Sequence, residues 1–381
     1  GMSALTRERE NDEDHEPPPV HWLGLVFGHA PLHHLGLFLD RYDFAALETL
    51  SPAMQENARK VIRARNERLP VGKRMSNLEG PFCVWVALKK LMKREGRQPH
   101  DMIATGGHER GLAVNTVMSL DLVTKRYTNL APMLTRRTQH ATAMLDGKLF
   151  VMGGYNDGSL STVECLDLET GQRSAMAPMT TGRYYHGAAV LEGKIYVAGG
   201  TPSWTAGTLV ESFDAATNQW TAVTPMNTPR CNHGLVSAQG KLFAVGGFNY
   251  QDGALSSVEC FDPSTRVWSN IAALSTARRS LAVAVLGDKL YAIGGYDSHY
   301  QRLSSVECLD LSVPNSQWTT VAPMTTPRAG MGAVVTGGKI YIAGGASSSI
   351  ECFDPSDGPA GRWTVVSETS EFTSQANISA C

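Results

Sequence analysis

Long hydrophobic runs and an excess of one charge are both absent from this sequence of 381 residues. No stretch of about 18 apolar residues is free of charge, so we expect no membrane-spanning helix. Lys and Arg number 34 against 36 Asp and Glu, which leaves a net charge of −2. Such a balance argues against a surface that binds nucleic acid or an acidic membrane as a whole. We therefore do not expect nucleic acid among the partners.

Motifs of catalysis are also missing. The chain has no GxSxG sequence, no P-loop and no GxGxxG that opens a helix. His21, His29, His33 and His34 cluster in an apolar stretch, but neither Cys pairs nor an HExxH motif accompany them. We accordingly predict a chain that is not an enzyme and that holds no metal or cofactor.

Cysteine is scarce, with seven residues, and no secretory signal is visible. Four of the cysteines recur at one position of an internal repeat, namely Cys165, Cys260, Cys308 and Cys352. Equivalent residues point the same way from different repeat units, so they are poor disulfide partners for one another. We expect buried, reduced thiols in a cytoplasmic protein.

Glycine is abundant by contrast, with 37 residues, and pairs of it recur along the chain. The pairs are Gly106-Gly107, Gly153-Gly154, Gly199-Gly200, Gly246-Gly247, Gly294-Gly295 and Gly344-Gly345. Successive pairs are separated by 46 to 50 residues. A period of about 50 residues with this content indicates a propeller array.

Each repeat contains four short β-rich runs with turn signals between them. A run such as KLFVM at 148–152 ends at the glycine pair, and a run such as VECLD at 163–167 follows a variable loop. A Trp, a turn such as APM or TPM, and an Arg that opens a further apolar run complete the unit. Local departures are VMSLD at 117–121 and Arg173, which stands where a Trp is expected.

These motifs resemble the kelch repeat, in six agreeing copies that run from Met102 to the C-terminus. The resemblance implies an all-β fold, a six-bladed β-propeller of four-stranded blades over residues 101–381. The first unit lacks a first strand of its own, and QANISA at 375–380 aligns with the first strands of other units. We expect this C-terminal strand to close the ring, because closure removes exposed sheet edges.

Two charged columns run through five of the repeats. Arg opens the first strand and Glu lies in the third strand of the same five blades: Arg137, Arg183, Arg230, Arg278 and Arg328, with Glu164, Glu211, Glu259, Glu307 and Glu351. In the first blade both positions are apolar, Phe372 and Met118. A buried ion pair would require this joint change, because the loss of one partner leaves an unpaired charge. We expect Glu259 to pair with Arg278; an Arg ring that binds an acidic ligand is the alternative.

The first hundred residues have a different composition. Residues 1–19 are predicted to be a disordered charged tail with a proline linker, and residues 20–100 a partly helical segment of unknown type. Between Arg59 and Arg97 there are 12 Lys or Arg and 3 Asp or Glu. A solvated helical face explains this excess; contact with RNA, anionic lipid or an acidic protein is the alternative.

Candidate binding residues lie in two sets of loops. Because antiparallel strands alternate in direction, the loops between second and third strands (2–3 loops) share one face with those between fourth and first strands (4–1 loops). In kelch adaptors, partner peptides are held by the residue after the glycine pair and by the residue after the first-strand Arg. The matching positions here are Tyr155, Tyr184, Cys231, Phe248, Arg279 and Tyr296. The same loops add Trp204, Tyr250, Tyr300 and Arg302.

This loop composition is typical of interface hot spots, although aromatic residues that merely cover the blade ends are the plainer explanation. We predict a protein-interaction module or adaptor that binds a partner peptide or loop on this face. Guanidinium groups beside Tyr and Trp favour carboxylates, so we expect acidic residues in the partner. A substrate receptor of a ubiquitin ligase is one form that the resemblance suggests. The alternatives are a kelch-type enzyme acting on a small sugar-like ligand and a cytoskeletal or assembly scaffold.

One histidine column could be mistaken for a catalytic set. His140, His186 and His233 recur at one first-strand position, where two other blades have Leu281 and Met331. A position that exchanges His for Leu serves packing more readily than catalysis. We interpret these histidines as packing residues.

Overall fold

The computed structural model describes residues 101–109, 112–122, 127–202, 205–345, 347, 349–368 and 377–380. The chain divides into two compact units, Gly1–Arg97 and Gln98–Cys381, and every described residue belongs to the second. The predictions for residues 1–19 and 20–100, and those for Trp204 and Phe372, lie outside the described residues. No helix of the described part is long and apolar enough to cross a membrane.

Six antiparallel sheets of four strands form the described unit, and each is one blade of a propeller. From the centre outward, blade 1 consists of β28 (Asn377–Ala380), β1 (Asp101–Thr105), β4 (Val117–Asp121) and β5 (Tyr127–Asn129). Blade 2 consists of β6 (Ala141–Leu145), β7 (Lys148–Met152), β8 (Val163–Asp167) and β9 (Arg173–Met176). Blade 3 consists of β10 (Gly187–Leu191), β11 (Lys194–Ala198), β12 (Val210–Asp214) and β13 (Gln219–Val223).

The second half of the ring repeats this order. Blade 4 consists of β14 (Gly234–Ala238), β15 (Lys241–Val245), β18 (Val258–Asp262) and β19 (Val267–Ile271). Blade 5 consists of β20 (Ala282–Leu286), β21 (Lys289–Ile293), β22 (Val306–Asp310) and β23 (Thr319–Val321). Blade 6 consists of β24 (Met331–Thr336), β25 (Lys339–Gly344), β26 (Ser349–Asp354) and β27 (Arg362–Glu368). Two small hairpins, β2 (His108–Glu109) with β3 (Leu112–Ala113) and β16 (Phe248–Asn249) with β17 (Gly253–Ala254), lie in 2–3 loops.

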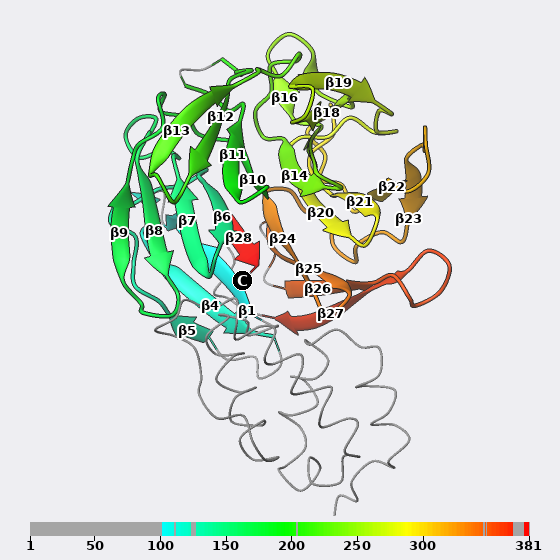
Figure 1. The fold of residues 1–381 in the computed structure, drawn as a ribbon. Helices are drawn as coiled ribbons and strands as arrows, with labels where there is room; N and C mark the ends of the chain where they lie inside the picture. The colour runs from blue at the N-terminus through cyan, green and yellow to red at the C-terminus, as the bar shows by residue number, and fades with distance from the viewer. Residues whose placement is uncertain are drawn as a thin grey trace, which may run out of the picture. The chain divides into compact units, whose positions relative to one another are not determined.

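The C-terminal strand closes the ring, as the repeat alignment predicts. β28 pairs antiparallel with β1, from Met102 opposite Ala380 to Thr105 opposite Asn377. In Figure 1 the red β28 lies at the centre of the ring beside β1, and it also contacts the first strands of both neighbouring blades, β6 and β24. The predicted fold, a six-bladed propeller of four-stranded blades, is confirmed.

The glycine pairs end the second strands, where neighbouring blades approach most closely. At Gly153 φ is +60° and at Gly154 it is +101°, a backbone region that favours glycine. A Cβ on Gly153 would lie 2.6 Å from the carbonyl oxygen of Arg183 and 2.7 Å from Cε1 of His186. Glycine therefore allows both the turn and the close contact with the next blade.

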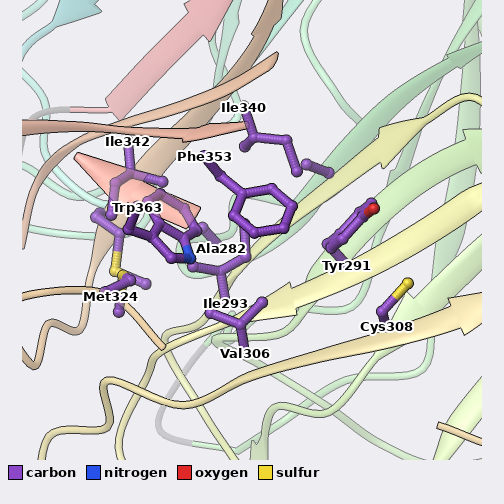
Figure 2. Packing of buried hydrophobic residues seen from close by; sticks show 12 residues of the cluster. Ala282, Tyr291, Ile293, Val306, Cys308, Met324, Ile340, Ile342, Phe353 and Trp363 are labelled. Atoms are coloured by element: carbon purple, nitrogen blue, oxygen red, sulfur yellow. The ribbon is translucent and has the colours of Figure 1, made fainter. Parts of the chain in front are cut away.

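The hydrophobic core lies between the blades. Figure 2 shows Ile293 and Val306 of blade 5 packed together with Ile342, Phe353 and Trp363 of blade 6. Similar clusters form between other neighbouring blades. Each blade therefore buries its apolar faces only when both neighbours are in place, which is why an open ring would be unstable.

A buried Arg–Glu pair lies inside five of the blades. In blade 4, Nη2 of Arg230 is 2.6 Å from Oε1 of Glu259, and neither side chain is exposed. Nη1 of Arg230 donates to the carbonyl oxygens of Gly246 and Ser257 at 2.8 and 3.1 Å. Oε2 of Glu259 accepts a hydrogen bond from the backbone of Asn227 at 2.7 Å. One ion pair thus joins the 4–1 loop, the glycine pair and the third strand of its blade.

The prediction that Glu259 pairs with Arg278 is wrong. Glu259 binds Arg230, whereas Arg278 binds Glu307 at 2.6 Å. The reason is the boundary between blades: Arg278 precedes the first strand of blade 5, so it meets the third strand of blade 5. The pairing within a blade that the columns predict holds in all five cases.

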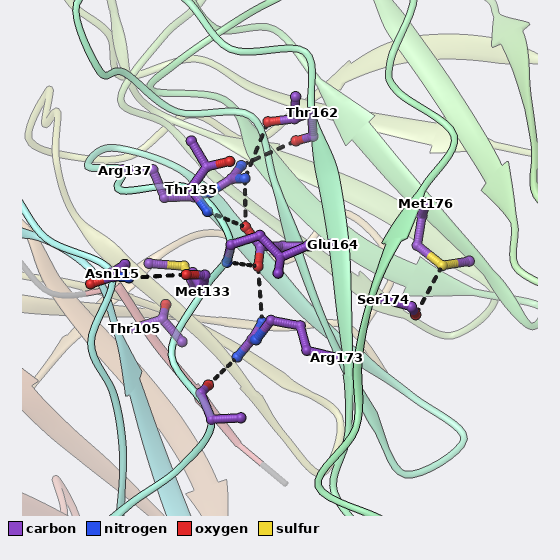
Figure 3. Close-up of polar contacts among 12 residues, drawn as sticks. Thr105, Asn115, Met133, Thr135, Arg137, Thr162, Glu164, Arg173, Ser174 and Met176 are labelled. Carbon is purple, nitrogen blue, oxygen red and sulfur yellow. Dashed lines mark hydrogen bonds and ion pairs between the residues drawn. The ribbon is translucent and has the colours of Figure 1, made fainter.

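Blade 2 shows how the missing Trp is replaced. In blades 3 to 6 the fourth-strand Trp donates through Nε1 to a backbone carbonyl of the preceding 4–1 loop, as Trp268 does to Thr224 at 2.9 Å. Arg173 takes this role by donating to the carbonyl of Ala131 at 2.6 Å. It also forms a second ion pair with Glu164, at 3.2 Å, so that Glu164 lies between Arg173 and Arg137 (Figure 3).

The histidine column packs between blades. His186 lies against Gly153 of blade 2 in the same way that Leu281 lies against Gly246 of blade 4. His140, His186 and His233 are all buried. Burial lowers the pKa of His186 to about 3, and it lowers the pKa of His140 and His233 well below the ordinary value. The three rings are therefore neutral in the folded protein near pH 7.

Removal of residues 377–381 tests the closure. The loss of β28 exposes the edge of β1 and removes the contacts of β28 with β6 and β24, so we expect aggregation or a fall in Tm of about 10 °C or more, given roughly 2–4 °C per kcal/mol for a domain of this size. Differential scanning calorimetry measures the change, with a control that lacks Cys381 alone. A truncated protein that melts with the control would contradict the closure.

Glu259→Ala tests the ion pair. It leaves the guanidinium of Arg230 buried without its carboxylate, so we expect a loss of about 3–5 kcal/mol of unfolding free energy in urea titrations. Combining Glu259→Met with Arg230→Phe, which copies Met118 and Phe372 of the first unit, should recover much of it. A double variant no more stable than the single one would show that the unpaired charge is not the cause.

Acidification tests the buried histidines. A histidine with a depressed folded pKa takes up its proton first in the unfolded chain, so stability should fall as the pH drops below about 6.5, by up to about 1.4 kcal/mol per pH unit for each ring. His186→Leu, which copies Leu281, should flatten the dependence of unfolding free energy on pH between 6.5 and 4. His299→Leu is the matched control, since this side chain is 88% exposed. Equal slopes for His186→Leu and the wild type would refute this origin.

Candidate functional site

The 2–3 loop of a blade lies directly beside the 4–1 loop that leads into the same blade. The backbones of Cys231 and Phe248 exchange hydrogen bonds of 3.0 and 2.8 Å, and those of Arg279 and Tyr296 exchange bonds of 2.9 and 2.8 Å. The residue after the first-strand Arg is thus paired with the residue after the glycine pair. The same bridge joins Thr138 with Tyr155 and Tyr184 with Thr201.

Tyrosines gather over blades 2 and 3. The rings of Tyr155 and Tyr184 lie edge to face with their centroids 5.3 Å apart, and Tyr184 lies at the same distance from Tyr185. Burial raises the pKa of Tyr184 and of Tyr185, so both phenols are neutral hydrogen-bond donors at pH 7. Tyr155 is 38% exposed and extends this cluster to the surface.

Arg279 forms the centre of a second cluster, over blades 4 and 5. Its guanidinium carbon lies 4.4 Å from the ring centroid of Tyr300, 5.0 Å from that of Phe248 and 5.7 Å from that of Tyr296. Three aromatic faces therefore hold this cation by cation–π contacts. Tyr250 packs edge to face on Phe248 at 5.2 Å.

Arg302 completes this cluster at its outer side. Its guanidinium carbon is 5.9 Å from the ring centroid of Tyr296, and its Nε donates to the hydroxyl of Tyr296 at 3.4 Å. Tyr250 and Tyr300 are 64% and 66% exposed, so large aromatic surfaces face the solvent here. We call Tyr155, Tyr184, Tyr250, Arg279, Tyr296, Tyr300 and Arg302, with Phe248, the aromatic rim.

Cys231 has a different position from the rest. Its side chain is only 4% exposed, and its Sγ is 3.5 Å from the carbonyl oxygen of Phe248. Burial raises the pKa of this thiol, which keeps it protonated. Cys231 therefore supports the backbone of the rim from below. The four cysteines that recur at one repeat position are also buried, namely Cys165, Cys260, Cys308 and Cys352. None of these five described cysteines forms a disulfide.

A cavity of about 550 Å³ lies inside the ring of first strands, next to the rim. Gln139, Tyr185, Asn232, Ser280 and Gly330 line its mouth, each two residues after a first-strand Arg. Arg279 and Tyr296 of the aromatic rim line it as well. In the sequence these residues share one feature, their fixed spacing after the first-strand Arg. Only the fold brings the five equivalent positions together around one opening.

The mouth residues form a chain of backbone hydrogen bonds around the channel. Tyr185 donates to Gln139, Asn232 to Tyr185, Ser280 to Asn232 and Gly330 to Ser280, at 2.7 to 2.9 Å. All five have a left-handed backbone, with φ between +51° and +70°. Four of them are not glycine, and such a backbone costs on the order of 1–3 kcal/mol at each. The hydrogen bonds hold this conformation and fix the side chains around the opening.

Carboxylates are not part of the described lining. The residues that line the cavity include His140, His186 and His233 but no Asp or Glu. Across the described residues, no group of three or more His, Cys, Asp or Glu side chains is arranged to hold a metal ion. What the arrangement offers is hydrogen bonding, aromatic contact and the positive charge of Arg279.

Comparison with known proteins gives family matches between residues 98 and 370. Residues 98–291 match the family model of the KLHDC2/KLHL20/DRC7 Kelch-repeats domain, and residues 277–325 and 327–370 match the Kelch motif. Among solved structures, one titled "Structure of YjhT" is similar at 19% sequence identity with a TM-score of 0.58, over 65% of this chain and 88% of that chain. At this identity the likeness shows the fold alone. No curated protein matches the chain.

Proposed function

The chain belongs to the kelch-repeat family, and from this premise we propose that it is a protein-interaction module whose aromatic rim binds a peptide or loop of a partner. Propellers of this family commonly serve as interaction modules. The observation that carries the proposal is the rim itself, where Tyr250 and Tyr300 are exposed and Arg279 is held by three aromatic faces. Tyr and Arg are the residue types that dominate binding energy at protein interfaces.

The charge of the rim favours a partner with acidic residues. Arg279 and Arg302 form no ion pair with a carboxylate among the described residues, so their charge is available to a partner. The nearby carboxylate of Asp297 is already occupied, because its Oδ1 accepts backbone hydrogen bonds from His299 and Gln301 at 2.8 Å. Guanidinium groups bind carboxylates through paired hydrogen bonds. We expect one or two acidic residues in a turn of the partner.

We also propose that the module works as an adaptor in the cytoplasm and does not catalyse a reaction. The packing of the histidine column supports this, since Leu281 fills the same place as His186 in another blade. Delivery of the bound partner to a ubiquitin ligase is one form of adaptor function, and it stays a prediction. The scaffold alternative rests on residues 20–100 and lies outside the described residues.

Changes in the outer rim test this proposal. A triple variant, Tyr250→Ala with Tyr300→Ala and Arg302→Gln, removes exposed aromatic surface and one cation without touching the buried ion pairs. We expect at least a tenfold loss of captured partner, since hot-spot truncations cost about 2 kcal/mol or more. Quantitative mass spectrometry of pull-downs from cell extract measures it, and capture by the wild type should weaken as salt rises.

The control is Arg266→Gln, which removes an exposed cation from the turn between β18 and β19 at the opposite end of blade 4. It should retain every partner, and all variants should share one Tm. If the triple variant keeps the partners of the wild type at equal yield, the binding face lies elsewhere. The turns of the opposite face would then be the next surface to change.

A further inference from the structure

The channel inside the ring is a cavity of different chemistry from the rim above it. Beyond the mouth, it is lined by small and apolar side chains of the first strands, among them Ala188, Val236, Val283 and Ala333. These residues come from four different blades, so the apolar wall extends around much of the channel. A volume of about 550 Å³ lies within the range of small-molecule sites.

Apart from Thr142 and the buried histidines His140, His186 and His233, the polar side chains of the lining are gathered at the mouth. The side chains of Gln139 and Ser280 form no hydrogen bond with another described residue. Among the described residues, the amide of Asn232 reaches only the sulfur of Cys231, at 3.9 Å. Their positions are fixed by the chain of backbone hydrogen bonds, so they offer donors and acceptors to a ligand without rearrangement.

Arg279 adds a single cation at the same place. Its guanidinium is held over the faces of Phe248, Tyr296 and Tyr300, which leaves the N–H groups at its edge for an acceptor. Its charge has no carboxylate partner among the described residues, and no Asp or Glu is among the described lining of the cavity. The site therefore carries an uncompensated positive charge at the mouth and an apolar wall beyond it.

We propose that the central channel binds a small amphipathic carboxylate, with the carboxylate at Arg279 and an uncharged apolar body among the alanine and valine side chains of the first strands. The mouth side chains, Gln139, Asn232 and Ser280, hydrogen-bond the polar end of the ligand. This is a small-molecule site, and it lies below the rim that holds a protein partner.

The distribution of polar groups decides the class of ligand. A sugar-like ligand needs hydrogen-bond partners along its whole length, because a buried hydroxyl without one costs free energy. The wall formed by Ala188, Val236, Val283 and Ala333 supplies none from its side chains. A cationic ligand would be repelled by Arg279. A carboxylate with an apolar tail satisfies both the mouth and the wall.

Ligand-observed NMR and calorimetry on the full chain test the site with hexanoate and 4-phenylbutyrate as probes. Hexanamide and 4-phenylbutyramide are the matched neutral compounds. We expect saturation transfer to be strongest at the tail of each carboxylate, and each amide to bind at least about tenfold more weakly, given the strength of hydrogen bonds to charged groups. Carboxylate and amide binding with equal affinity, or neither binding, would overturn the proposal.

Variants place the ligand in the channel. Arg279→Gln should reduce hexanoate affinity about tenfold or more, whereas Arg266→Gln, an exposed cation in the turn between β18 and β19, should not. Ala188→Leu and Ala333→Leu fill the channel from two different blades and should abolish binding of the tail. Ala216→Leu, at an exposed alanine, is their control. Full hexanoate binding in either folded channel variant would show that the ligand lies outside the channel.

Two channel variants are used in case one of them fails to fold, because Ala188 and Ala333 belong to different blades. A variant is accepted only if its Tm matches that of the control.

The same design distinguishes the rim from the channel. Loss of partner capture in the outer-rim triple variant tests the protein-binding face, since that variant leaves the channel residues Ala188 and Ala333 unchanged. Loss of hexanoate binding in Ala188→Leu tests the channel alone, because Ala188 lines the cavity.

Discussion

The buried Arg–Glu pair found in five of the six blades is the interaction on which the face of the propeller depends. Arg278 donates to the carbonyl of Gly294 at 2.9 Å and to Glu307 at 2.6 Å, and Glu307 holds the backbone of Ser275 at 2.7 Å. The next residues along the chain, Arg279 after Arg278 and Tyr296 after the glycine pair, belong to the aromatic rim. A charge pair that is costly to bury thus fixes both halves of the candidate site from below.

Packing between blades provides the second constraint, and different residues satisfy it in different blades. A Trp bonds to the preceding blade in four cases, and Arg173 makes the equivalent bond in blade 2 while adding a charge beside Glu164. His, Leu and Met share one interblade position in the same manner. What matters at such positions is the volume filled and the backbone group satisfied, because each blade is stable only through its neighbours.

These constraints produce two sites of unlike chemistry at one end of the ring. The aromatic rim stands on loops whose backbones are paired two by two, so its exposed rings can vary without disturbing the blades. The channel mouth instead consists of left-handed residues joined by a chain of backbone hydrogen bonds, and these residues line one cavity. Arg279 belongs to both, so the proposed protein-binding rim and the proposed small-molecule cavity share one cation.

The repeat in the sequence determined the number of blades, the strand order and the closing role of residues 377–380. The number and order follow from the repeat period, and the closing role follows because the first unit lacks a first strand of its own. It also placed the candidate residues in neighbouring loops. The partner of Glu259, the burial of Cys231 and the stacking of Phe248, Tyr296 and Tyr300 on Arg279 were decided by tertiary structure. A repeat states which positions are equivalent, but the contacts of a residue depend on which neighbouring blade it faces. Only the closed ring brings Gln139, Tyr185, Asn232 and Ser280, each from a different blade, around one opening.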